Sequence, residues 1–131
     1  MIVVDTNIVA YLLLPGEYTD SAESLYERDD EWAAPILWRS EFRNLLSSYM
    51  RSGRLDLVDA KRLQHEAESL LAGNEYEADS ALVLDLAATS GCTAYDCEFV
   101  ALSQRLDVPL VTLDRALLKA FPRLTRKFGT G

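Results

Sequence analysis

The stretch Ile2-Val3-Val4-Asp5-Thr6-Asn7 indicates the fold class, because a short β-branched run ends in an acid directly before an apolar helical pattern. A second run of this kind, Leu110-Val111-Thr112, is followed two residues later by Asp114. Short, uninterrupted apolar runs are typical of strands buried on both faces of a parallel sheet. We therefore expect two buried strands, each with an acid at its carboxyl end.

Glycine and proline divide the rest of the chain into helical and extended segments. The apolar periodicity predicts helices over residues 7–14, 19–29, 36–52, 57–71, 79–89, 93–106 and 115–121. Further short strands are expected over residues 32–34, 75–78 and 125–128. Strands that alternate with helices predict a parallel sheet covered on both faces. Without a linker or an internal repeat, residues 1–131 are predicted to form one α/β domain.

The composition excludes several classes of function. The chain has 131 residues, 13 Lys and Arg against 21 Asp and Glu, and a formal net charge of −8. This excess of acid argues against a protein that holds nucleic acid by charge alone. The single histidine, His65, excludes mechanisms that require two imidazoles. A zinc site is not expected, since Cys92 and Cys97 are the only thiols.

No membrane segment or secretion signal is expected. The longest apolar run, Ile8 to Leu14, is far shorter than the roughly 20 residues that a membrane-spanning helix requires. The first residues contain neither a basic region nor a cleavage site. The two cysteines are interpreted as packing residues rather than a disulfide framework. We therefore expect a cytoplasmic protein.

Four acids stand where chemistry is expected. Asp5 and Asp114 follow strands, and sites in open parallel sheets form at the carboxyl ends of strands. Asp96 lies in the first turn of its predicted helix, and Glu41 lies at the edge of an apolar helical arc. Converging carboxylates repel one another unless a hard divalent cation such as Mg²⁺ or Mn²⁺ neutralises them. Such a site would hydrolyse a phosphodiester with a water molecule that the metal activates.

The same acids have a purely structural interpretation. Asp and Thr are good N-cap residues, and Asp5, Asp96 and Asp114 each lie near a predicted helix start. Glu41 is the exception, because it lies inside its helix. Spacing alone therefore leaves two alternatives open, an acidic metal cluster or a set of helix caps.

Four stretches also carry a resemblance to a known family. They are, in chain order, Ile2-Val3-Val4-Asp5-Thr6-Asn7, Ser40-Glu41-Phe42, Tyr95-Asp96-Cys97-Glu98-Phe99-Val100-Ala101-Leu102 and Leu110-Val111-Thr112-Leu113-Asp114. In their order and separation, along nearly the whole chain, they resemble the PIN-domain family. Within that family, the chain resembles the VapC-like toxins of bacterial and archaeal toxin–antitoxin pairs.

The resemblance implies a three-layer α/β/α sandwich with a central, mostly parallel sheet and a Mg²⁺- or Mn²⁺-dependent endoribonuclease activity. It implies a catalytic quartet of Asp5, Glu41, Asp96 and Asp114. The expected metal ligands are Asp5, Asp96 and Asp114, with Glu41 acting through a bound water. The residues expected to support them are Thr6, Asn7 and Thr112. Glu98 is left out of the site because it lies two residues from Asp96 and so on another side of the helix.

Positive charge gathers in two segments. Residues 39–65 carry six basic and three acidic groups, and residues 115–131 carry five basic groups and no acid. The expected RNA contacts are Arg115, Lys119 and Arg123, of which Arg115 adjoins Asp114.

The resemblance further implies an inhibitory antitoxin partner and a homodimer. The apolar residues 8–14 fit either core packing or a groove for a partner helix. Two other functions use the same residues: a housekeeping RNA-processing nuclease, and a non-catalytic PIN-like module that binds a partner.

Overall fold

A five-stranded parallel sheet forms the centre of the computed structural model, which describes residues 1–129. The strands lie in the order β3-β2-β1-β4-β5, and every neighbouring pair is parallel. Their bounds are Ile2–Val4 for β1, Trp32–Pro35 for β2, Glu75–Tyr76 for β3, Leu110–Thr112 for β4 and Thr125–Lys127 for β5. The chain thus builds the sheet outward from β1 in both directions.

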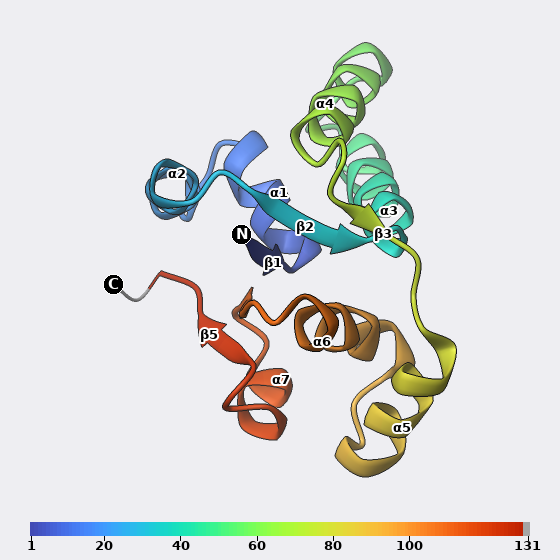
Figure 1. The fold of residues 1–131 in the computed structure, drawn as a ribbon. Helices are drawn as coiled ribbons and strands as arrows, with labels where there is room; N and C mark the ends of the chain where they lie inside the picture. Colours follow the sequence, from blue (N-terminus) through green and yellow to red (C-terminus); the bar gives the residue numbers. More distant parts are fainter. Residues whose placement is uncertain (130–131) are drawn as a thin grey trace.

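Helices cover both faces of this sheet (Figure 1). One layer contains α1 (Thr6–Leu13), α2 (Thr19–Arg28), α3 (Leu37–Arg51) and α4 (Leu57–Leu70). The other contains α5 (Ser80–Ser90), α6 (Ala94–Leu106) and α7 (Arg115–Ala120). Contacts of α6 with β1, β2 and β4 close that side, while α1 and α3 pack over β4 and β2. The expected three-layer α/β/α sandwich is confirmed, and the sheet is parallel throughout.

The core explains why the first helix is so apolar. β1 and β4 are buried along their whole length, as the uninterrupted apolar runs predict. Ile8 and Val9 are fully buried, because α1 contacts α2, α3, α4 and β4. Packing inside the fold therefore accounts for that face of α1. Both cysteines are free thiols.

The predicted elements are all present, with ends that differ by no more than two residues. The largest difference is at β3, which ends at Tyr76 instead of continuing to Ala78. Only two residues pair there, Glu75 with Ala34 and Tyr76 with Pro35. Among residues 1–129, no helix is both long and apolar enough to cross a membrane.

Candidate functional site

The carboxyl ends of β1 and β4 bring the first two acids together. These strands are neighbours, and the register pairs Val4 with Val111. The chain leaves them in opposite directions across the sheet, so a crevice opens at this point. Asp5 follows β1 directly and Asp114 follows β4 after one intervening residue.

A buried hydroxyl joins the two acids. The Thr112 Oγ1 donates to Asp5 Oδ2 over 2.8 Å and accepts from the backbone N–H of Asp114 over 3.0 Å. Thr112 is completely buried, so both hydrogen bonds form away from water. Burial raises the pKa of the Asp5 carboxyl above its ordinary value of 3.8, the Thr112 hydrogen bond opposes that rise, and repulsion from Asp114 adds to it.

Glu41 lies in the second turn of α3 and is held by the first residue of α1. The Thr6 Oγ1 donates to Glu41 Oε1 over 2.7 Å, and Thr6 itself is buried. Burial raises the pKa of Glu41 above its ordinary value of 4.5, against the effect of this hydrogen bond. Repulsion from Asp5, Asp96 and Glu98 raises the pKa further, so Glu41 faces acids from α6 as well as from β1.

Asp96 completes the group from the first turn of α6. Burial raises its pKa above 3.8, and repulsion from Asp114 and Asp5 raises it again, while a hydrogen bond with Thr93 lowers it. The four predicted acids thus lie close enough to repel one another. In the described part of the chain, the charged groups that shift the pKa values of Asp5, Glu41 and Asp96 are all carboxylates.

The donor set suits a hard divalent cation. Carboxylate and hydroxyl oxygens are the ligands that Mg²⁺ and Mn²⁺ prefer, and uncompensated carboxylates gain most from such an ion. As the side chains stand, no three acidic, histidine or cysteine residues among residues 1–129 form a closed metal cage. The chemistry of the residues fits such an ion, and the carboxylates would have to turn toward one another to share one.

Comparison with known proteins shows the family. Residues 2–124 match the family model of the PIN domain. The chain belongs to the PIN-domain family. It is also 30% identical over 126 residues to a protein named ribonuclease VapC3, from Pyrobaculum aerophilum, and the match spans 94% of this chain and 96% of that relative. The resemblance stated from the sequence is confirmed.

Solved structures agree on the PIN fold. The protein PAE2754 from Pyrobaculum aerophilum superposes with a TM-score of 0.76 at 23% identity, over 97% of this chain and 83% of that one. A toxin–antitoxin complex from Klebsiella pneumoniae contains a chain with a TM-score of 0.70 at 14% identity, over 96% of each chain. At these identities the matches establish the architecture.

Helix capping and acid clustering coexist in this PIN domain. Asp114 Oδ1 accepts from the backbone N–H of Leu117 over 3.0 Å and so caps α7. Asp5 Oδ1 accepts a longer bond, 3.4 Å, from the N–H of Asn7, and the Thr93 hydroxyl caps α6. Capping therefore accounts for one oxygen of Asp5 and one of Asp114 and leaves their repulsion unexplained.

Two of the three predicted RNA contacts border one pocket, beside the acids. Arg115 and Lys119 line a pocket of about 800 Å³, together with Lys127. Leu113 separates this pocket from a smaller one, of about 200 Å³, that Asp5, Asn7, Tyr11 and Asp114 line. Arg123 is exposed and is not part of either lining, so its role in RNA binding stays a prediction.

Several neighbours of the site carry no signal in the sequence motifs. Glu98, which the helical spacing separates from Asp96, still raises the pKa of Glu41. Tyr18 and Phe128 line the large pocket from opposite ends of the chain. Two of them leave a chemical trace in the sequence: Glu98 is a second acid within the Asp96 motif, and Phe128 is an aromatic residue between Lys127 and Gly129.

Proposed function

We propose that this PIN domain is a Mg²⁺- or Mn²⁺-dependent endoribonuclease and the toxin of a toxin–antitoxin pair. One observation carries the proposal: carboxylates from the ends of β1 and β4 and from α3 and α6 gather at the carboxyl ends of the strands, where burial and mutual repulsion raise the pKa of Asp5, Glu41 and Asp96. The identity with a protein named ribonuclease VapC3 supports an RNA substrate. The complex titled toxin–antitoxin supports an antitoxin partner.

Asp5, Asp96 and Asp114 are the residues that would hold the metal ion. When bound, the ion would supply positive charge against the scissile phosphate and lower the pKa of a nearby water molecule. Thr112 fixes the Asp5 carboxylate through its Oδ2 and the Asp114 backbone through its N–H. Thr6 restrains Glu41 through Oε1, and Oε2 makes no hydrogen bond to a described residue. These hydroxyls restrain one oxygen of Asp5 and one of Glu41, which is the orienting role that residues around a metal site commonly have.

Asn7 belongs to the supporting residues, since its backbone N–H reaches Asp5 and its side chain borders the small pocket. The substrate is expected to approach along the neighbouring cations Arg115, Lys119 and Arg123. We also propose that the protein acts in the cytoplasm and pairs as a homodimer, in line with exposed apolar side chains such as Val58 and Leu84.

The test is RNA cleavage by the wild type and by Asp96→Asn, each with Mn²⁺ and with EDTA. We expect cleavage only by the wild type with Mn²⁺, since the variant lacks one carboxylate of the cluster. Asp85→Asn, which neutralises an exposed acid on α5, is the matched control and should cleave like the wild type. Equal activity of Asp96→Asn and the wild type contradicts the proposed site.

A non-catalytic PIN-like module remains the rival, favoured by the caps that Asp5 and Asp114 make. Calorimetric titration with Mn²⁺ separates the two. A nuclease should bind the ion with an affinity that Asp5→Asn and Asp96→Asn each weaken. Absence of binding, or binding that neither substitution changes, favours the module.

A further inference from the structure

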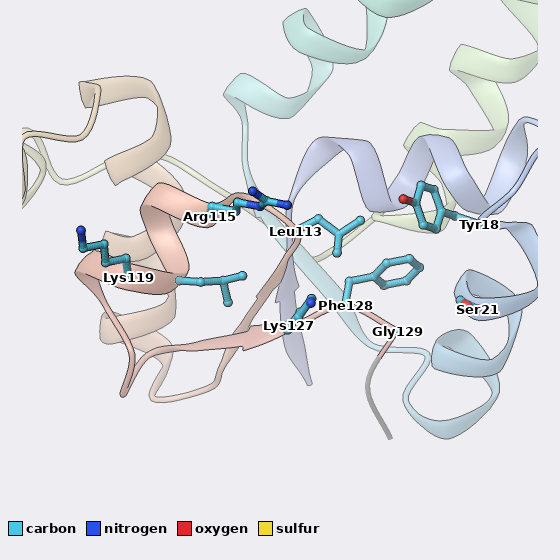
Figure 2. A pocket seen from close by; sticks show the side chains of 9 residues that line it. Tyr18, Ser21, Leu113, Arg115, Lys119, Lys127, Phe128 and Gly129 are labelled. Atoms are coloured by element: carbon cyan, nitrogen blue, oxygen red, sulfur yellow. The ribbon is translucent and has the colours of Figure 1, made fainter.

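The large pocket beside the acids combines positive charge with aromatic surface. Its lining includes Tyr18, Leu113, Arg115, Lys119 and Phe128 (Figure 2). We propose that this pocket is a nucleotide subsite, in which one unpaired RNA base stacks on Tyr18 while neighbouring phosphates contact Arg115 and Lys119. This inference rests on the proposed function and adds the part of the substrate that the protein grips: a single-stranded nucleotide beside the scissile bond.

Tyr18 has the features of a platform on which a base can stack. Tyr18 is an exposed aromatic residue, with 37% of its surface accessible to solvent. The ring packs on Tyr11, with centroids 4.7 Å apart, and meets Phe128 edge-on at 6.0 Å. Phe128 is buried, so it supports the tyrosine from behind. A ring that is partly exposed and held by two neighbouring rings offers stacking surface at a small cost in conformational entropy.

The platform is tied to the acidic cluster through the backbone and through Tyr11. The Phe128 N–H donates to the carbonyl of Thr112 over 2.9 Å, so one residue anchors both Phe128 and Asp5. Tyr11 packs on Tyr18 and Phe128 and also lines the small pocket with Asp5 and Asp114. A base on Tyr18 would therefore lie next to the site where the phosphodiester is cut.

The charge of the pocket favours nucleic acid. Arg115 and Lys119 are exposed and project from successive turns of α7, and Lys127 enters the lining from β5. No acid lines this pocket among the described residues, although the chain as a whole carries a net charge of −8. Cations for phosphates beside an aromatic face for a base are the two components of single-strand recognition. A volume of about 800 Å³ accommodates a nucleotide.

The test measures binding without cleavage, in the Asp96→Asn protein with EDTA. Two labelled probes of about 12 units are used: oligo(A) RNA, and a ribose-phosphate chain of equal length without bases. Loss of stacking by Tyr18→Leu should weaken oligo(A) binding by about fivefold or more and leave the base-free chain unaffected. Tyr18→Phe should restore oligo(A) binding. Arg115→Gln should weaken both probes by the same factor, because it removes a phosphate contact.

Controls and contrary outcomes are defined by the same two probes. Tyr95→Leu and Lys61→Gln change exposed residues outside the pocket and should leave both Kd values unchanged. If Tyr18→Leu leaves the ratio of the two Kd values unchanged, no base stacks there and the proposal is wrong. If an acidic peptide of repeated Glu-Phe depends on Tyr18 while oligo(A) does not, the pocket is a peptide site, and the proposal is again wrong.

The outcomes separate this subsite from the nuclease. If oligo(A) binding depends on Tyr18 but the wild type cuts no RNA when metal is present, the subsite is supported and the proposed function is overturned. If the wild type cuts RNA in a metal-dependent way but Tyr18→Leu leaves the ratio of the two Kd values unchanged, the proposed function is supported and the subsite is overturned. Circular dichroism of each variant shows that the fold is retained.

Discussion

Thr112 links the fold to the chemistry more directly than any acid does. Its hydroxyl donates to Asp5 and accepts from Asp114, and its carbonyl accepts from Phe128. A β-branched residue suits a buried strand, and a hydroxyl there satisfies two polar groups that would otherwise lack a partner. The Thr112 side chain thus packs β4 into the core and also orients the Asp5 carboxylate.

Thr112→Val should separate these roles, because valine keeps the shape and removes the hydroxyl. Asp5 Oδ2 and the Asp114 N–H would each lose a buried partner, at about 1–3 kcal/mol per group. We expect a lower free energy of unfolding and a Mn²⁺ affinity about 10- to 100-fold weaker, as is usual when a ligand loses its orienting hydrogen bond. Urea unfolding and calorimetric titration measure the two effects.

Thr125→Val is the matched control for Thr112→Val. Thr125 is also a buried threonine of the sheet, and its hydroxyl donates to the Phe121 carbonyl over 2.7 Å, away from the acids. This variant should lose stability and keep its Mn²⁺ affinity. Thr112→Ser should restore the affinity. Unchanged Mn²⁺ affinity in Thr112→Val would remove Thr112 from the proposed metal site.

At the scale of elements, Glu75 fastens the edge of the sheet to the helix that carries Glu41. Its Oε2 accepts from Trp38 Nε1 over 2.8 Å and from Arg39 Nε over 2.6 Å. Arg39 also reaches Glu68 on α4 at 3.0 Å. A strand of two residues has few hydrogen bonds of its own, so these side chains hold β3 against α3. Arg39, the first cation of the basic segment 39–65, is thus engaged in a structural network.

Glu75→Gln should lower stability in a pH-dependent way. The Arg39 hydrogen bond holds the pKa of Glu75 below its ordinary value of 4.5, and the Trp38 bond acts in the same direction against burial. A lowered folded pKa stabilises the protein above the unfolded value and loses that stabilisation as pH falls through the folded value. Because about a third of the Arg39 side chain is exposed, we expect roughly 1 kcal/mol at neutral pH.

Urea unfolding of wild type and Glu75→Gln, at neutral pH and below the lowered pKa of Glu75, measures this difference. Glu77→Gln, an exposed acid two residues further along, is the control and should unfold like the wild type at both pH values. A difference between wild type and Glu75→Gln that persists at acid pH would contradict an ionic origin.

The sequence predicts elements well here and predicts neighbours poorly. Gly16, Gly53 and Gly73 follow amphipathic runs, and uninterrupted apolar runs mark β1 and β4, so the helices and strands are visible locally. The proximity of Glu98 to Glu41 depends on how α6 and α3 are placed relative to each other in the fold. The spacing of residues along either helix does not predict that placement. The meeting of Tyr18 with Phe128 likewise depends on sheet register.

For the whole molecule, the acidity has two parts with different consequences. Residues 66–114 carry ten acidic groups and one basic group, whereas residues 115–131 carry five basic groups and no acid. Asp5 and Asp114 line a small pocket at the carboxyl ends of the strands, and the cations of α7 line the larger pocket beside it. A protein with a net negative charge can thus carry a positively charged surface next to its cluster of acids. If the protein binds RNA as proposed, the long-range charge should weaken nonspecific binding while the local cations contact phosphates.

The repulsion within the cluster predicts that metal and folding are coupled. A ligand that binds only the folded state at one hundred times its Kd stabilises by about 2.7 kcal/mol. For a domain of this size, we expect Mn²⁺ at that concentration to raise Tm by about 10 °C. In EDTA, Asp96→Asn should melt above the wild type, because it removes a charge that repels Glu41 and that Asp114 and Asp5 repel in turn. With Mn²⁺, its Tm should rise less than that of the wild type. Asp85→Asn, whose acid is exposed on α5, should follow the wild type in both conditions. A Tm that Mn²⁺ leaves unchanged in every variant would assign the acids to helix capping, since capping needs no cation to offset it.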